Sequence, residues 1–354
     1  MSVVNVASCW KQLGGENNWD DLLHPLDLYL RRYIIHCLQK AGAAGDVFNT
    51  TKVSKCYALT LYPPEAYFDK VGLEKGNPYH YRLTDFIYAA TGDDTAAYIA
   101  YVAVATDEGT AALGRRDILV SWRGTTTSEE WASDVNLIQT SAKDLFGTDL
   151  VQVHAGFYSI YTKSIASNPY AKTSAREQAL KAVRALVDEY EHEELTTEST
   201  SRRGNLFKAF MVTAFPAASP RVGDAGFKAV YGPYRECHGP RSYGPYAPLI
   251  YKHVGQFLEI DTTKSPHLKS PNNPHILEIY RHGVARVQEN GEFKLEEELH
   301  FDNAIVNKHG GSLVDDYEIP DNWWTTELFK GMVQEEDGRW KFIDSAYVPD
   351  PPTA

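Results

Sequence analysis

The stretch SAREQALKAVRALVDEYEHEELTTESTSRRGNLFKAFMVTAFPAASPRVGD, residues 174–224, decides which fold the chain can adopt. Its first part places apolar residues at steps of three and four: Ala179, Val183, Leu186, Val187 and Tyr190. That spacing predicts an amphipathic helix. A polar run over 194–204 follows, and residues 210–215 then predict a strand that closes on a turn over 216–224.

The text on either side continues this alternation of helices and strands. YIAYVAVATDEG at 98–109 and RDILVSWRGT at 116–125 are short, β-rich apolar runs separated by a turn that contains glycine, which predicts two strands. Residues 24–45 predict a helix that ends at Gly42, and NPHILEIYRHGVARV at 273–287 predicts another. Strands that alternate with helices predict an α/β fold with a mostly parallel sheet flanked by helices.

Composition limits the function classes. The 354 residues carry 35 Lys and Arg against 47 Asp and Glu, a formal net charge of -12, so we expect no nucleic-acid partner. The four cysteines are irregularly spaced, which indicates reduced thiols and no metal or other cofactor. The start of the chain lacks a basic region followed by an apolar one, so we expect a cytoplasmic protein. No linker divides the chain, which favours a single domain over 1–354 with an N-terminal helical segment at about 1–45.

Two segments could carry chemistry. ILVSWRGTTTSEEWASD at 118–134 ends an apolar strand at Arg-Gly-Thr, where backbone amides and hydroxyls at a sheet edge could form an oxyanion hole with Thr125. The structural alternative is an ordinary turn in which the threonines and Ser128 cap a helix. In VQVHAGFYSIY at 151–161, His154 ends a short alternating strand, and it could be a catalyst or a hydrogen-bonded structural group.

The order of four motifs resembles the class 3 lipases, and among them the plant phospholipase A1 enzymes of the cytosolic class II type. These motifs are SWRGT, VHAGF, VTAFPAASPRVGD and SPNNPHILEIYRHGVA, and LVDDYEIPDNWW near the end is similar to the family too. The resemblance implies an α/β-hydrolase fold and a Ser-Asp-His triad that removes the sn-1 acyl chain of a glycerophospholipid through an acyl-enzyme. It implies a glycerolipid or phospholipid substrate and transient contact with a membrane surface.

The family's nucleophile stands in a G-H-S-L-G elbow, and this chain has no G-x-S-x-G anywhere. The interval where the elbow belongs, 191–211, instead holds the polar run, so we expect the elbow strand and helix to be missing or replaced. No serine fits the pattern, and this includes Ser199, Ser201, Ser219, Ser242 and Ser312. The nucleophile is therefore unassigned.

Of the other two triad members, the histidine can be assigned and the acid cannot. His275 is the first histidine of the family motif H-x-L-E-x-Y-L-H-G-V-A, whose first histidine is the catalytic one, and His282 is the second. The acid is unassigned, because CHGPRSYGPYAP at 237–248 stands where the family carries Val-Pro-Asp, and because Asp224 and Asp261 match other family positions. A frameshift within this stretch would also explain the loss.

Three hypotheses follow from these losses. The first is a phospholipase A1 by descent whose own activity is very low. The second is a catalytically inactive, lipase-like protein that binds lipid or a protein partner. The third is an active hydrolase with an unrecognised nucleophile.

Overall fold

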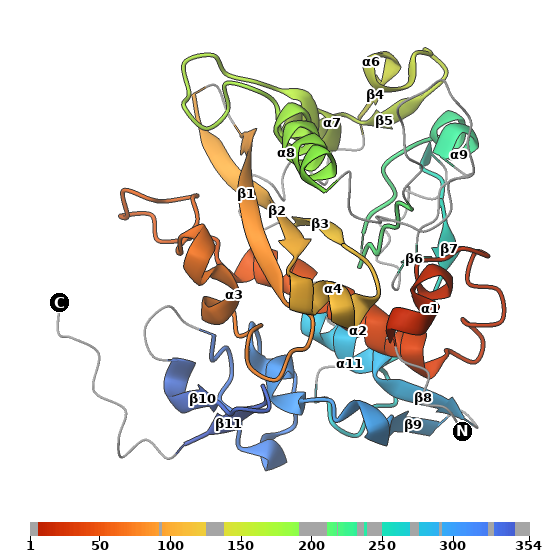
Figure 1. Ribbon diagram of the computed structural model, residues 1–354, viewed down its shortest axis with the longest axis vertical. Helices are drawn as coiled ribbons and strands as arrows, with labels where there is room; N and C mark the ends of the chain where they lie inside the picture. The colour runs from red at the N-terminus through yellow and green to blue at the C-terminus, as the bar shows by residue number, and fades with distance from the viewer. Residues whose placement is uncertain are drawn as a thin grey trace.

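The structure of the protein is a computed structural model. It describes residues 6–91, 94–124, 138–190, 211–217, 219–231, 237–238, 250–269, 276–289, 292–324 and 329–343 (Figure 1). Within these ranges, helices lie on both sides of a twisted sheet, and the C-terminal part of the chain forms small hairpins at one end of the molecule.

Two helices open the chain, α1 (Val6–Leu13) and α2 (Leu28–Asp46). Asp27 caps α2, because its carboxylate accepts hydrogen bonds from the amides of Tyr29 and Leu30 at 2.8 and 2.9 Å. The predicted helix is confirmed, but it ends at Asp46 rather than at Gly42. A Cβ at residue 42 would lie 3.4 Å from Leu277, so this glycine serves the close packing of another segment and does not end the helix.

The main sheet has the order β1-β2-β3 and is antiparallel throughout. Its strands are β1 (Tyr81–Ala90), β2 (Ala96–Ala105) and β3 (Ile118–Trp122). The two strands predicted around 98–125 are confirmed as β2 and β3. A short helix, α4 (Asp107–Leu113), joins them where a turn was expected, capped by Thr106 and ended by Gly114 at φ 75°.

The expected mostly parallel pairing is wrong for the described strands, of which only β6 (Cys237–His238) and β7 (Gln256–Phe257) pair in parallel. Residues 91–95, which join β1 to β2, are too few for the crossover that parallel neighbours need. Residues 211–215, within the strand predicted over 210–215, form one bridge and no strand. The Phe215 ring packs against Trp19 and Tyr33, with centroids 5.8 and 5.5 Å apart. The interval 191–210, where the elbow was expected to be missing, lies outside the described residues.

The predicted amphipathic helix is confirmed as α8 (Ala175–Glu189), which begins with a capping box between Ser174 and Glu177. It lies across the sheet in Figure 1, and its Ala179, Ala182 and Leu186 share a core with β1 and β2. Before it come β4 (Gln139–Ser141), α6 (Lys143–Phe146), β5 (Gln152–His154) and α7 (Ala155–Thr162).

The later half of the chain contains α9 (Ala225–Tyr231) and α11 (Leu277–Val284), the second of which confirms the helix predicted over 273–287. Two hairpins follow, β8 (Arg286–Glu289) with β9 (Glu292–Leu295), and β10 (Met332–Gln334) with β11 (Trp340–Phe342). The short helices are α3 (Tyr67–Lys70), η1 (Pro64–Ala66), η2 (Glu297–Leu299), η3 (Asn303–Asn307), η4 (Asp315–Tyr317) and η5 (Phe329–Gly331).

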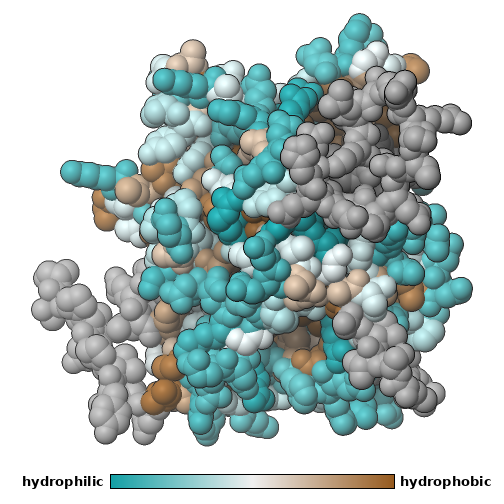
Figure 2. Space-filling view, viewed as in Figure 1, coloured by the Kyte–Doolittle hydropathy of each residue, from teal (hydrophilic) through white to brown (hydrophobic). Residues whose placement is uncertain are grey.

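Hydrophilic residues cover most of the face drawn in Figure 2. The largest core lies beneath them, where α2 packs against the sheet through residues such as Leu30, Tyr98 and Tyr101. Trp19, Leu23 and Leu26, between α1 and α2, belong to the same core. Among the helices of the described residues, none is long and apolar enough to cross a membrane.

The side chain of Gln178 acts as a clip on the outer edge of β1. Its Oε1 accepts a hydrogen bond from the Tyr88 amide at 3.0 Å, and its Nε2 donates to the Tyr88 carbonyl at 2.9 Å. We expect Gln178→Ala to lower the free energy of unfolding by about 1–3 kcal/mol, because both backbone groups lose their partner. Urea denaturation measures this, and a loss equal to that of Lys181→Ala on the same helix would contradict it.

Candidate active site

The two assigned site residues, Thr125 and His275, lie outside the described residues, as do Ser128, Ser199, Ser201 and Ser242. The structure does describe the chain immediately beside both of them. Gly124 follows β3, and Ile276 precedes α11. The site is therefore built from the packing of these two flanking segments.

Both flanking segments pack against the same short part of α2. The Ser121 hydroxyl of β3 donates a 2.9 Å hydrogen bond to the Lys40 carbonyl, which also accepts one from Tyr101. Leu277 of α11 lies against Gly42, only two residues further along α2. The strand that leads to Thr125 and the helix that follows His275 thus converge on one turn of a buried helix.

A second contact fixes the direction of α11. Arg31 of α2 donates hydrogen bonds to the carbonyls of Val284 and Arg286 at the far end of α11. Since Leu277 meets Gly42 at the near end, α11 is held along α2 at both of its ends. Burial lowers the pKa of Arg31 to about 10, so the guanidinium still carries its charge at neutral pH.

Arg123 fixes the end of β3. Its Nε donates to the Tyr98 carbonyl at 2.7 Å, and one terminal nitrogen donates to the Gly124 carbonyl at 2.8 Å. Its guanidinium also lies over the Phe48 ring, 4.2 Å from the centroid. The contacts of Arg123 with Tyr98 of β2 and with Phe48, which follows α2, therefore fix the backbone just before Thr125.

His154 lies where predicted, at the end of β5, and its contacts favour the structural interpretation. It caps α7, since its Nδ1 accepts a hydrogen bond from the Phe157 amide at 3.4 Å. The ring is buried against Tyr251, with centroids 5.9 Å apart, and its Nε2 has no partner among the described residues. A ring that uses one nitrogen as a helix cap is poorly placed to act as a base.

The structure brings Ser265 and His282 together, a pair that the sequence did not predict. The Ser265 Oγ lies 2.8 Å from Nε2 of His282, and it also accepts a hydrogen bond from the His267 amide at 3.2 Å. Both residues are buried, and burial, with a smaller effect from His267, lowers the pKa of His282 to about 3. The pair resembles a nucleophile and its base, but its closed environment makes it an anchor for α11.

The two aspartates that match other family positions serve local structure. Asp224 Oδ1 accepts hydrogen bonds from the Phe227 amide at 2.8 Å and from the Gln152 amide at 3.2 Å, which caps α9. Asp261 Oδ1 accepts from the Thr263 amide and hydroxyl at 2.9 and 2.6 Å. These turns account for both carboxylates without a catalytic role.

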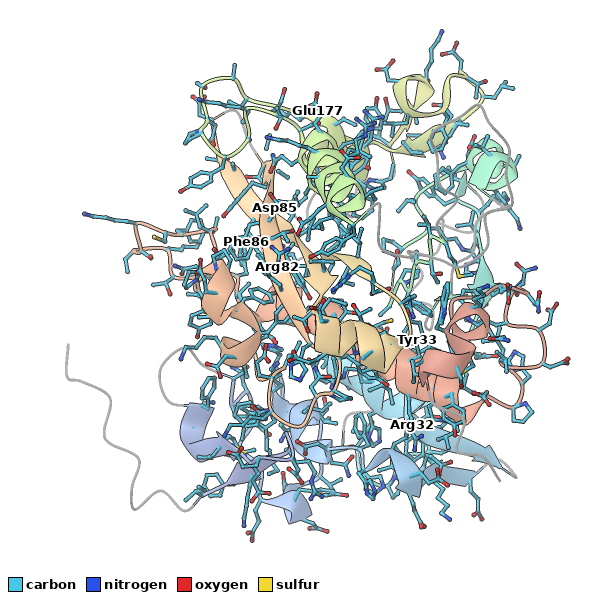
Figure 3. All side chains as sticks on the ribbon, in the orientation of Figure 1. Arg32, Tyr33, Arg82, Asp85, Phe86 and Glu177 are labelled. Atoms are coloured by element: carbon cyan, nitrogen blue, oxygen red, sulfur yellow. The ribbon has the colours of Figure 1, made fainter. Side chains whose placement is uncertain are left out.

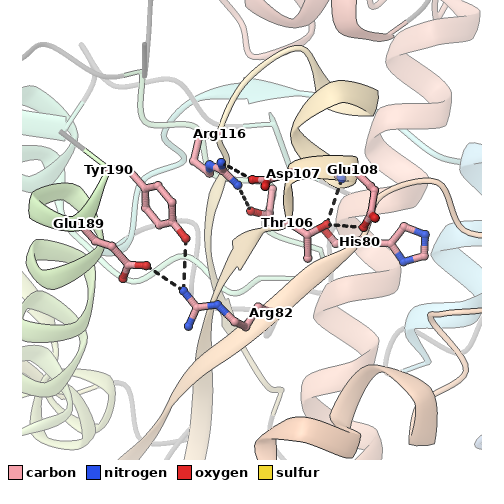
Figure 4. Close-up of polar contacts among 10 residues, drawn as sticks. His80, Arg82, Thr106, Asp107, Glu108, Arg116, Glu189 and Tyr190 are labelled. Atoms are coloured by element: carbon pink, nitrogen blue, oxygen red, sulfur yellow. Dashed lines mark hydrogen bonds and ion pairs between the residues drawn. The ribbon is translucent and has the colours of Figure 1, made fainter. Parts of the chain in front are cut away.

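An ion network anchors α8 at the point where the interval without an elbow begins. Arg82 of β1 contacts the Glu189 carboxylate at 3.1 Å and the Tyr190 hydroxyl at 3.3 Å (Figure 4). Arg116 lies 4.5 Å from the Tyr190 ring centroid and pairs with Asp107 at 2.7 Å. In Figure 3, Arg82 lies on β1 and Glu177 marks the first turn of α8.

Among the described residues, no three His, Cys, Asp or Glu side chains are grouped to hold a metal ion.

Comparison with known proteins gives the class first. The model of the family described as lipase (class 3) matches residues 119–198, from β3 through α8 into the interval that follows it. A fungal lipase in complex with an inhibitor has a TM-score of 0.33 and 17% identity, and the match covers 66% of this chain and 82% of that chain. The class defined by the family match is that of the lipases, which are ester hydrolases of α/β type.

Similar proteins of known name point to a narrower group within the lipases. Phospholipase A1-IIgamma of Arabidopsis thaliana is 36% identical over 392 residues, which cover 96% of this chain and 93% of that protein. Phospholipase A1-II 4 of Oryza sativa subsp. japonica is 36% identical over 381 residues, with 96% of each chain covered. The chain belongs to the class 3 lipases of the plant phospholipase A1-II family. The resemblance first seen in four ordered motifs is thereby confirmed.

Proposed function

We propose that this chain is a phospholipase A1-type acylhydrolase that acts on the sn-1 ester of a glycerophospholipid with very low turnover. The observation that carries the proposal is the similarity to phospholipase A1-II proteins along 96% of the chain. His275 is the base in this proposal, and the Thr125 segment stabilises the oxyanion. The convergence of their neighbours on Lys40 and Gly42 supports one shared site.

Turnover is low because no serine stands in an elbow. Removal of a triad nucleophile typically costs about 10⁶ in rate, and the remaining catalysis comes from the oxyanion hole and substrate binding. His275 then has no hydroxyl to activate, and water must attack the ester directly. The residual reaction keeps the regiochemistry of the site, since the binding of the glycerolipid decides which ester lies beside the base.

We also propose transient contact with a membrane surface, from which the substrate is taken, and a cytoplasmic location. Two exposed apolar side chains support the surface contact, Ile138 before β4 and Leu150 before β5, which are 60% and 79% exposed. Transfer of such side chains from water to a lipid surface lowers the free energy.

The test uses phosphatidylcholine vesicles that carry a labelled acyl chain at either sn-1 or sn-2. We expect the purified chain to float with the vesicles and to release the sn-1 chain slowly and selectively, and we expect His275→Ala to abolish this release. A fluorophosphonate probe should not label the protein. Labelling that disappears in one Ser→Ala variant would mean an unrecognised nucleophile. Binding without any sn-1 release would favour the lipid-binding alternative instead.

A further inference from the structure

A buried carboxylate joins the end of α2 to the loop after η3. The side chain of Asp46, the last residue of α2, is 1% exposed. Its Oδ1 lies 2.7 Å from Nε2 of His309, and its Oδ2 pairs with the ammonium of Lys308. The side chain of His309 is 39% exposed, so the carboxylate faces the protein while the ring reaches the solvent.

The hydrogen bond to Asp46 sets the state of the ring. A carboxylate only accepts, so Nε2 of His309 carries a proton and the lone pair of the neutral ring lies on Nδ1. Among the described residues, none is hydrogen-bonded to that Nδ1. An aspartate that holds a histidine in one tautomer, with the other nitrogen free, is the arrangement by which hydrolases prepare a general base.

The charges around the ring favour this role. Burial alone would lower the pKa of His309, but the hydrogen bond and charge of Asp46, with the charge of Glu278, raise it. Lys308 opposes them, and its ammonium is shared with the Trp324 ring, 3.8 Å from the centroid. The ring therefore takes up a proton more readily than a free imidazole does, as a base near neutral pH should.

Two glycines follow His309 and are required by close packing. A Cβ on Gly310 would lie 2.7 Å from Ile276, and a Cβ on Gly311 would lie 2.3 Å from the Asp321 carboxylate. Both residues are half-buried, and in the described part of the chain their amides donate to no acceptor. Two free amides in succession are the kind of donor that stabilises an oxyanion.

We infer that Asp46, His309 and the amides of Gly310 and Gly311 form a second, water-activating centre that hydrolyses short-chain carboxylic esters from solution. Nδ1 of His309 removes a proton from water as the water oxygen attacks the ester carbonyl carbon. The bond from that carbon to the alcohol oxygen then breaks, and the proton passes to the leaving alkoxide, which gives one carboxylic acid and one alcohol. The chemistry needs neither a serine nor His275, so it stands apart from the proposed phospholipase function.

The test follows hydrolysis of 4-nitrophenyl butyrate by the full chain. We expect His309→Gln, in which the amide can still donate to Asp46, to lower the protein-catalysed rate by about 10²-fold or more. The matched control is His80→Gln, since His80 also contacts a carboxylate, Glu74 at 3.0 Å, but one that is itself 40% exposed. That control should keep the full rate. Prior treatment of the wild-type protein with a fluorophosphonate should not change its rate.

Two further readouts separate a base from a structural role. The rate should rise with pH through the raised pKa of His309 and then level off, because only the neutral ring can accept the proton. Product should also form without an initial burst, since no acyl-enzyme accumulates. The inference is overturned if His309→Gln retains the wild-type rate, if the wild type gives no protein-catalysed rate, or if a burst appears.

Discussion

Replacing Asp46 with alanine is expected to lower the free energy of unfolding by about 3–5 kcal/mol. The side chain of Lys308 is 9% exposed and that of Asp46 is 1% exposed, so both charges of the pair are removed from water. Burial raises the pKa of Asp46, but the charge of Lys308 and the hydrogen bond from His309 outweigh it and lower that pKa overall. The alanine variant leaves the ammonium buried without its partner, which is the costly half of such a pair.

Urea denaturation at pH 7 measures this loss, with Asp144→Ala as the control because Asp144 is exposed on α6. The double variant Asp46→Leu, Lys308→Met removes both charges and should recover most of the stability, since an apolar pair can replace a buried ion pair at little cost. A single-variant loss below about 1 kcal/mol would mean that Lys308 finds water or another partner.

Replacing Lys40 with methionine is expected to raise the free energy of unfolding by about 3 kcal/mol at pH 7. The side chain lies in the core with its Nζ 5.0 and 4.9 Å from the ring centroids of Phe68 and Tyr81, and 3.5 Å from the Tyr79 carbonyl. No described carboxylate lies within ion-pair distance of it. Burial lowers the pKa of Lys40 to about 8, and the charge of Glu74 offsets this only in part. Methionine has a similar length and no charge.

The same substitution should change the pH dependence of stability. Below pH 8 the lysine is protonated in both the folded and the unfolded chain, and the folded state carries the full cost of the buried charge. Between about pH 8 and the ordinary lysine pKa of 10.5, the unfolded chain binds the extra proton, so the wild type gains stability as the pH rises. Lys40→Met should lose this gain. An unchanged slope would show that Nζ is solvated.

Periodicity in the sequence was sufficient to predict α2, α8 and α11, because each has an apolar face at steps of three and four residues. The charges buried on α2 were not predictable, since charged side chains such as Arg31 and Lys40 are ordinarily exposed, and Asp46 lies beyond Gly42, where the helix was predicted to end. Their partners come from other parts of the chain, such as Val284 and Lys308, and no local pattern shows such pairs.

The sheet and the site were predicted less well. β1 was not predicted, because its alternation is broken by two register shifts, between Leu83 and Asp85 and between Ile87 and Tyr88. In the candidate site, the family motifs supplied His275, whereas the contacts of His309 and of the Ser265–His282 pair arise only from folding. Ser265 and His282 lie 17 positions apart, and although His282 is the second histidine of the family motif, nothing in the sequence pairs it with Ser265.

The contact between Asp46 of α2 and Lys308, late in the chain, has a consequence for the synthesis of this protein. Asp46 leaves the ribosome early, but Lys308 is synthesised 262 residues later. At about 5–20 residues per second, this delay is on the order of tens of seconds. Throughout it, a helix with an apolar face and three charges destined for the interior must wait without its partners. We expect nascent chains of this protein to depend on chaperones until η3 emerges.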